Sequence, residues 1–163
     1  MRNKQKGFSL IELLIVVAII LIIAAIAIPN LIRSRMAANE ASAVASIRTV
    51  NTAEVVFSTT YALPGLFSAA LADLGDGAGT CANPATPPTA TNACLIDNAL
   101  ATATAAPGKS GYVFTYTNPV GQYTISAAPL TPNSTGVRGF FSDQSLVIRA
   151  ANPSPATAAS APL

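Results

Sequence analysis

The sequence has no histidine, and its 163 residues include only two cysteines. Without histidine, Ser-His and Cys-His catalytic pairs and metal sites that need imidazole ligands are excluded. Paired-carboxylate catalysis would depend on aspartates in turn-like segments, where solvated caps and turns are the ordinary role. No glycine-rich phosphate loop follows a predicted strand. We therefore expect a protein that is not an enzyme.

Charge is also scarce, because only 10% of the residues are charged and the formal net charge is +2. Three of the nine basic residues, Arg2, Lys4 and Lys6, lie at the extreme N-terminus. Without them, six basic residues (nine minus three) face seven acidic ones, so the remainder is close to neutral. No basic patch is left to bind nucleic acid, and we expect no nucleic-acid partner.

The sequence does contain one long apolar run, from Phe8 to Ile28, which is followed by Pro29. As a helix with about 1.5 Å of rise per residue, this run is long enough to cross a bilayer core of about 30 Å. Its one charged residue is Glu12, and a carboxylate in a membrane helix costs on the order of 2.5 kcal/mol and needs a partner. The basic residues before the run predict a cytoplasmic N-terminus.

Gly7 lies directly before the apolar run. In an ordinary secretory signal the cleavage site follows the apolar region, which is then removed. Cleavage at Gly7 would instead leave the apolar helix on the mature chain. Two alternatives remain open: cleavage after the A-x-A pattern at 25–27, which would release a soluble protein, and an uncleaved anchor whose Glu12 reaches the headgroups.

The segment 6–12 (Lys-Gly-Phe-Ser-Leu-Ile-Glu), with the apolar run and Pro29, closely resembles the N-terminus of type IV prepilins and type II secretion pseudopilins. The resemblance implies that prepilin peptidase cuts at Gly7 and that Phe8 becomes the N-methylated first residue. It also implies that Glu12 meets the Phe8 amine of a neighbouring subunit. In a core of low dielectric, this charge-assisted contact would satisfy the carboxylate and fix the axial register between subunits.

Pro29 is expected to kink the helix and not to end it, because good helix formers resume on both sides. Residues 30–58 contain no glycine or proline. Apolar residues recur there at spacings of three and four, at Ala43, Ile47, Val50, Ala53 and Phe57. We therefore predict one helix over residues 8–60, with a membrane half (8–28) and an amphipathic half (29–60) packed on a globular head.

The head is predicted to span residues 61–149. It begins with turn signals and a possible short helix at 66–74. Glu40 and Glu54, on the helix that it covers, are expected to be solvated or subunit-facing surface charges. Residues 99–107 are expected to be a loop or a marginal helical turn.

Four short strands are predicted in the second half of the head, because β-branched and aromatic residues alternate there between turn signals. They are 111–117, 122–127, 139–142 and 145–149, and Asp143-Gln144 is the predicted turn of the second hairpin. The fold class is therefore α+β, with one long helix on a small antiparallel sheet. Residues 150–163 contain only small, polar and proline residues before the final leucine, and we predict a disordered tail.

Cys81 and Cys94 are predicted to form a disulfide, because the compartment beyond the membrane is oxidising and no histidine is present to complete a zinc site. Closing this loop would stabilise the folded state by about 3 kcal/mol. Two free thiols are the alternative.

No cofactor is expected. Asp73 and Asp76 supply two carboxylates, fewer than the six to eight oxygens that calcium takes. The pseudopilin resemblance implies a calcium site in a C-terminal loop, where Asp143 is the one acid available.

Together these features predict a structural subunit that polymerises into a type IV pilus after leader cleavage (residues 1–7) and N-methylation. The resemblance implies several partners: copies of itself or other pilins, prepilin peptidase/N-methyltransferase, and an inner-membrane platform protein with its assembly ATPase. Before assembly the chain would lie in inner-membrane lipid, and afterwards in an extracellular pilus or a periplasmic pseudopilus. The alternatives are a pseudopilin of type II secretion and a membrane-anchored periplasmic binding module.

Overall fold

The computed structural model describes residues 8–61, 66–76, 81, 87–119 and 121–163. The chain divides into two compact units, residues 1–35 and residues 36–163. The first unit carries the apolar part of the long helix, and the second is the head. The α+β class predicted from the sequence is confirmed.

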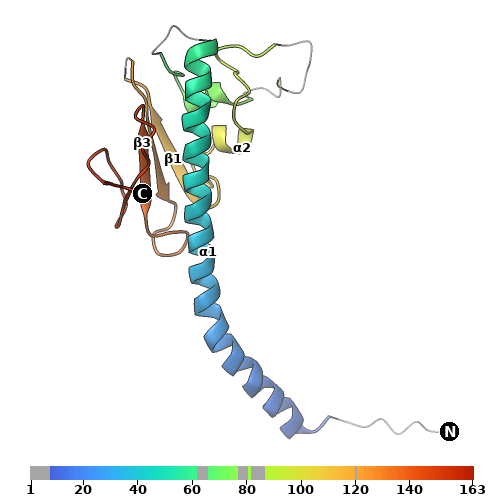
Figure 1. Ribbon diagram of the computed structural model, residues 1–163. Coiled ribbons are helices and arrows are strands. Elements are labelled where there is room, and N and C mark those ends of the chain that lie inside the picture. The colour runs from blue at the N-terminus through green and yellow to red at the C-terminus, as the bar shows by residue number, and fades with distance from the viewer. Residues whose placement is uncertain (1–7, 62–65, 77–80, 82–86, 120) are drawn as a thin grey trace, which may run out of the picture. The chain divides into compact units, whose positions relative to one another are not determined.

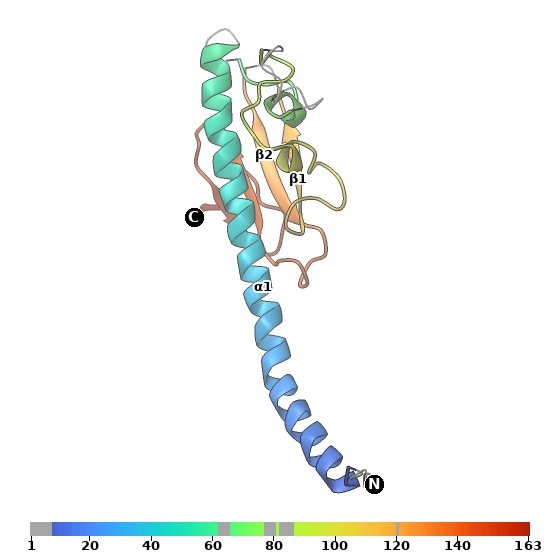
Figure 2. The same cartoon turned by 90° about the vertical axis from the view of Figure 1, so that its right-hand side faces the viewer.

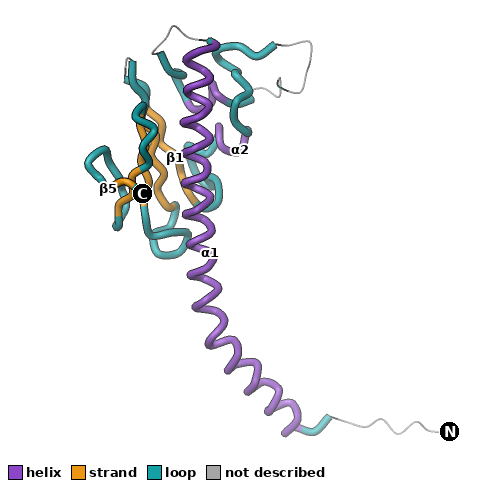
Figure 3. The backbone as a smooth tube through the Cα atoms, in the orientation of Figure 1, coloured by secondary structure: helices purple, strands orange, loops and turns teal. Residues whose placement is uncertain are grey.

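Helix α1 extends from Leu10 to Thr60 without interruption and contains Pro29 (Figure 3). The single long helix predicted from the sequence is therefore confirmed. The kink at Pro29 stays a prediction. Inside the head, the C-terminal part of α1 lies along one face of the sheet in both views (Figures 1 and 2).

The sheet is antiparallel, and its five strands follow one another in chain order. The strands are β1 (Tyr112–Thr117), β2 (Thr124–Pro129), β3 (Gly139–Asp143), β4 (Arg149–Ala151) and β5 (Ala161–Pro162). In this register Phe114 pairs with Ala127 on the neighbouring strand, and Ala127 pairs with Phe140 on the next one. Because side chains alternate along a strand, these residues share one face of the sheet, and that face meets α1.

The core lies between this sheet face and the apolar stripe of α1. All five residues of the predicted stripe are buried: Ala43, Ile47, Val50, Ala53 and Phe57. From the sheet, Tyr112, Phe114, Ile125 and Phe140 are fully buried against them. The periodicity of the amphipathic half therefore identified the packed face correctly.

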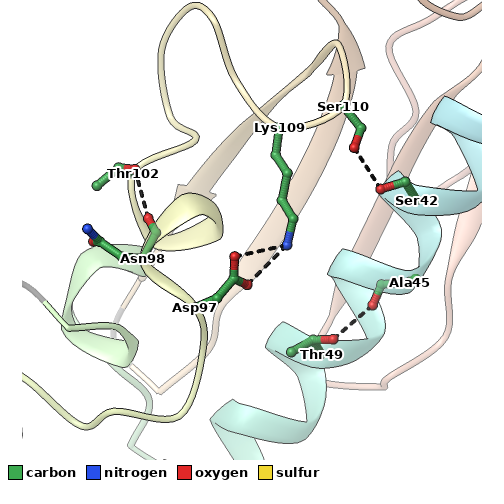
Figure 4. A network of polar contacts seen from close by, with 8 residues as sticks. All are labelled: Ser42, Ala45, Thr49, Asp97, Asn98, Thr102, Lys109 and Ser110. Carbon is green, nitrogen blue, oxygen red and sulfur yellow. Dashed lines mark hydrogen bonds and ion pairs between the residues drawn. The ribbon is translucent and has the colours of Figure 1, made fainter. Parts of the chain in front are cut away.

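Two short helices precede the sheet, namely η1 (Leu71–Leu74) and α2 (Asn98–Ala101). The segment 99–107, expected as a loop or helical turn, begins within α2. Figure 4 shows two contacts of the corner formed by Lys109 and Ser110, just before β1. The Lys109 ammonium lies 3.0 Å from the Asp97 carboxylate, and the Ser42 hydroxyl donates to the Ser110 hydroxyl over 2.9 Å. The corner therefore connects the start of α2 to helix α1.

The second predicted hairpin was wrong in its connection. Its return strand was placed at 145–149 after a turn at Asp143-Gln144, whereas β3 reaches Asp143 and β4 begins at Arg149. The Asp143 carboxylate accepts the Ser145 N–H, and the Asp143 carbonyl accepts the Leu146 N–H. These are the hydrogen bonds of a β-turn over residues 143–146, so the chain does turn after Asp143, but residues 147–148 still separate this turn from β4.

The disordered tail predicted for residues 150–163 was also wrong. The segment contributes to β4 and forms β5, and the two strands pair with each other. Arg149 donates from Nη1 to the Ser160 carbonyl over 3.1 Å, and the Leu163 N–H donates to the Ile148 carbonyl over 2.9 Å. A Cβ at Gly139 would lie 2.6 Å from the Ser154 hydroxyl, so the missing side chain lets the tail approach β3. Backbone pairing with the sheet edge supplies the order that composition did not indicate.

Candidate assembly site on the N-terminal helix

The first turn of α1 is organised by Ser9 and Glu12. The Ser9 backbone N–H donates to Oε2 of Glu12 over 2.9 Å, and the Ser9 carbonyl accepts the Leu13 N–H over 3.3 Å. A glutamate that returns to the N–H at the start of its own helix forms one half of a capping box. A negative charge there also interacts favourably with the helix dipole. The pattern Ser-x-x-Glu before an apolar run signals this role, which the sequence reasoning above missed.

Phe8 and Glu12 are both exposed and lie four positions apart in the chain. The Phe8 side chain is 84% exposed, and Oε1 of Glu12 accepts no hydrogen bond from the described residues. One oxygen of the carboxylate therefore caps the helix, while the other has no hydrogen bond from the described residues. Gly7, the predicted cleavage site, lies outside the described residues.

The helix beyond Glu12 is exposed on every side. Its large apolar residues from Leu13 to Ile28 are roughly half to three-quarters exposed, and within the described residues α1 alone is long and apolar enough to cross a membrane. Full apolar coverage around a helix is typical of a segment buried in lipid or among other helices. This apolar surface therefore requires contact with lipid or with helices of other chains.

The two acidic residues farther along α1, Glu40 and Glu54, form hydrogen bonds within the head. Glu40 was expected to be a surface charge, and this was wrong: its Oε1 accepts the backbone N–H groups of Val137 and Arg138, and the Arg138 Nε lies 2.8 Å from its Oε2. Burial alone would raise the pKa of Glu40, but these hydrogen bonds and the guanidinium charge outweigh burial and lower it.

Glu54 was also expected at the surface, but it is fully buried. The hydroxyl oxygens of Ser68 and Tyr116 both lie 2.5 Å from its Oε1, and the Ser68 N–H donates to its Oε2 over 3.0 Å. Burial raises the pKa of Glu54, and the hydrogen bonds only partly oppose this effect. Asn51, one turn earlier, binds Ser142 and Tyr123 in the same buried layer.

Neither glutamate of the head is therefore available to a neighbouring subunit, because both are occupied by hydrogen bonds within the chain. A 3.6-residue period identifies an apolar face but does not show which polar residues at its edge become buried. Among the acids of α1, Glu12 is the one with a carboxylate oxygen that accepts no hydrogen bond from the described residues.

The predicted disulfide between Cys81 and Cys94 is confirmed, with the two Cα atoms 5.7 Å apart. Beside it, the Ala93 N–H donates to the Asp73 carbonyl over 2.8 Å, and the Leu95 N–H donates to the Leu74 carbonyl over 2.7 Å. The disulfide therefore closes a loop that returns along η1.

The aspartates considered for calcium have other contacts. The Asp73 carboxylate accepts the Ala70 N–H over 2.9 Å, and the Asp76 carboxylate accepts the Cys81 N–H over 3.2 Å. Asp143 accepts the Ser145 N–H in the β3–β4 connection. Within the described parts of the chain, no three Asp, Glu, Cys or His residues gather closely enough to hold a metal ion.

Comparison with known proteins points to the same N-terminal segment. Residues 2–28 match the family described as the prokaryotic N-terminal methylation motif. The match covers the N-terminal segment alone, which carries this methylation motif. The chain's pilin-like features are thus the methylation motif and a long helix on an antiparallel sheet.

The chain is similar to two curated proteins whose names describe major type IV pilus components. The type IV wide pilus major component PilA4 of Thermus thermophilus is 65% identical over 40 residues, which are 24% of this chain and 30% of the relative. The type IV major pilin protein PilA of Myxococcus xanthus is 46% identical over 54 residues, 33% of this chain and 24% of the relative. The matches thus span less than a third of each relative. No solved structure matches the chain significantly.

Proposed function

We propose that the chain is a major structural subunit of a type IV pilus, assembled after leader cleavage at Gly7 and N-methylation of Phe8. The observation that carries this proposal is the start of α1, where one carboxylate oxygen of Glu12 has no hydrogen bond from the described residues and the apolar helix that follows is exposed on every side. The methylation motif at residues 2–28 and the two pilus relatives support it.

Leader cleavage would create a positively charged partner for the Glu12 carboxylate. The new amine on Phe8 stays protonated near neutral pH, and a charge-assisted contact from an ammonium to a carboxylate oxygen is about 2.7–2.9 Å long. Oε2 can keep the Ser9 N–H while Oε1 takes the Phe8 ammonium of the next subunit. Capping and assembly therefore use different oxygens of one side chain and do not compete.

The apolar helix supplies the remaining part of assembly. Before assembly it is covered by inner-membrane lipid, and its N-terminus faces the cytoplasm where Arg2, Lys4 and Lys6 precede the cleavage site. In the filament, copies of the same helix replace the lipid. Extraction costs lipid contacts at each step, so it requires the platform protein and assembly ATPase that the resemblance implies.

The experiment separates the charge of Glu12 from its capping role. Glutamine is also accepted at this position of a capping box, so Glu12→Gln keeps the helix start and removes the charge. We expect normal processing and membrane insertion but no filaments. Ser9→Ala is the matched control, because Ser9 contacts Glu12 through its backbone N–H and should retain filaments. Abundant normal filaments from Glu12→Gln would refute the proposed role.

A pseudopilin of type II secretion is the second candidate, because the N-terminal segment is shared by both groups. Deletion distinguishes them: loss of surface fibres supports the pilus, whereas exoproteins trapped in the periplasm support the pseudopilus. A membrane-anchored periplasmic binding module would form no polymer under either condition.

A further inference from the structure

The exposed apolar helix is bounded by charges of opposite sign. Between Glu12 and Arg33 lie 20 residues without a charge, and their only side chain with hydrogen-bonding groups is that of Asn30. The distance along the helix from Glu12 to Arg33 is about 32 Å at 1.5 Å per residue, close to the bilayer core of about 30 Å. If Arg33 lies at the outer boundary of the core, Glu12 lies at the cytoplasmic one.

Arg33 and Arg35 are both exposed, and neither has a hydrogen bond or ion pair with the described residues. Two positions apart on an α-helix, they are separated by about 200° and point to opposite sides. A single protein surface cannot cover both guanidinium groups. A layer of phospholipid headgroups surrounds the helix and can contact both.

We propose that Arg33 and Arg35 bind the phosphate groups of outer-leaflet phospholipids, preferring anionic lipids, and so hold the unassembled subunit at a fixed depth. The planar guanidinium binds phosphate oxygens in pairs, which makes arginine well suited to this contact. The depth that results places Glu12 at the cytoplasmic headgroup boundary, close to the Phe8 amine that cleavage creates. This inference rests on the membrane-stored subunit proposed above.

The chain offers a clean reporter, because it contains no tryptophan. Leu31→Trp, at a position that is 68% exposed and one helical turn before Arg35 on the same face of α1, places one fluorophore beside the proposed contact. The full chain is reconstituted in vesicles that mix phosphatidylglycerol and phosphatidylcholine. One of the two lipids is brominated near the headgroup end of its acyl chains, so that quenching reports which lipid contacts the helix.

We expect phosphatidylglycerol to compete for the site about fivefold better than phosphatidylcholine. The preference should disappear in the Arg33→Gln/Arg35→Gln variant. It should persist in Arg48→Gln, which makes the same change in charge at an exposed position of α1 within the head. Addition of free inorganic phosphate should not change the quenching, because the lipid and not the free ion is the ligand.

The outcomes separate this inference from the proposed function. Equal quenching by both lipids in the wild-type reporter, or a preference that survives in the double variant, would overturn the arginine contact and leave the membrane span intact. A reporter that no brominated lipid quenches would show that the helix is not in the bilayer, and would overturn the stored subunit as well.

Discussion

Replacing Glu54 by alanine removes the central acceptor of the buried contact between α1 and the segment that follows it. Three groups point at this carboxylate: the Ser68 N–H, the Ser68 hydroxyl and the Tyr116 hydroxyl. The two hydroxyl oxygens also lie 2.9 Å from each other, and the Tyr116 hydroxyl lies 2.9 Å from the Ser68 carbonyl. They can therefore be satisfied without Glu54, whereas the buried Ser68 N–H cannot.

The expected loss of stability follows from the Ser68 N–H that is left without an acceptor. One orphaned buried N–H costs about 1–3 kcal/mol, and the one lost methylene group costs about 0.8 kcal/mol. We expect Glu54→Ala to lower the free energy of unfolding by about 2–4 kcal/mol. Thr52→Ala, an exposed change whose hydroxyl bonds only the Arg48 carbonyl, should change it by less than about 0.5 kcal/mol.

The loss should also depend on pH, because burial raises the pKa of Glu54 above its ordinary value of 4.5. A raised pKa means that the folded state holds the proton more tightly than the unfolded state. The contribution of Glu54 is complete below the unfolded pKa and decreases as pH rises through the folded pKa. The difference between wild type and Glu54→Ala should therefore be larger at pH 5 than at pH 8.

The assay is guanidinium unfolding of the full chain in detergent micelles, followed by the near-ultraviolet circular dichroism of its four tyrosines. All four lie in the unit 36–163, so the signal reports the head. A loss below about 1 kcal/mol would refute the assignment of Glu54 as the acceptor that Ser68 requires. A loss that grows from pH 5 to pH 8 would refute the direction given for its pKa.

Three further predictions use the same assay. Because the pKa of Glu40 is lowered, its carboxylate stabilises the wild-type fold above pH 4.5, and this stability is lost as pH falls through the lowered pKa. Glu40→Gln should therefore be less stable than wild type near neutral pH, and the two proteins should become equally stable in acid. A difference in stability that does not change with pH would contradict this. Replacing both Cys81 and Cys94 by serine should lower stability by about 3 kcal/mol, and no change would show that the loop is not restrained by the bond. Ile47→Ala should cost about 2–5 kcal/mol because Ile47 is fully buried, whereas Ile15→Ala, in the exposed apolar part of α1, should leave unfolding of the head unchanged.

The helix and its packed face could be predicted from the sequence because both follow from local patterns. An apolar run of bilayer length and a stripe at spacings of three and four each require only residues that are near in the chain. The strands at 111–117 and 122–127 were found for the same reason. Pairing of the tail with β4 was missed because backbone pairing at a sheet edge depends on distant residues and leaves little trace in composition.

The site was predictable in part. The spacing of Gly7, Phe8 and Glu12 pointed to the start of the helix, but it did not reveal that one Glu12 oxygen caps that helix. The burial of Glu40 and Glu54 was missed because it depends on donors at Arg138, Ser68 and Tyr116, which approach only in the folded head. Sequence patterns identify which acids lie near an apolar face, and tertiary structure decides which of them are buried.

The most direct test of the filament subunit is mass spectrometry of the N-terminal peptide from the membrane fraction and from sheared surface material. The proposal predicts a chain that begins at N-methylated Phe8, present in the sheared fraction and in the membrane. An intact Met1 in every fraction, or a chain that begins at Ile28, would contradict processing at Gly7 and with it the assembly role of Glu12.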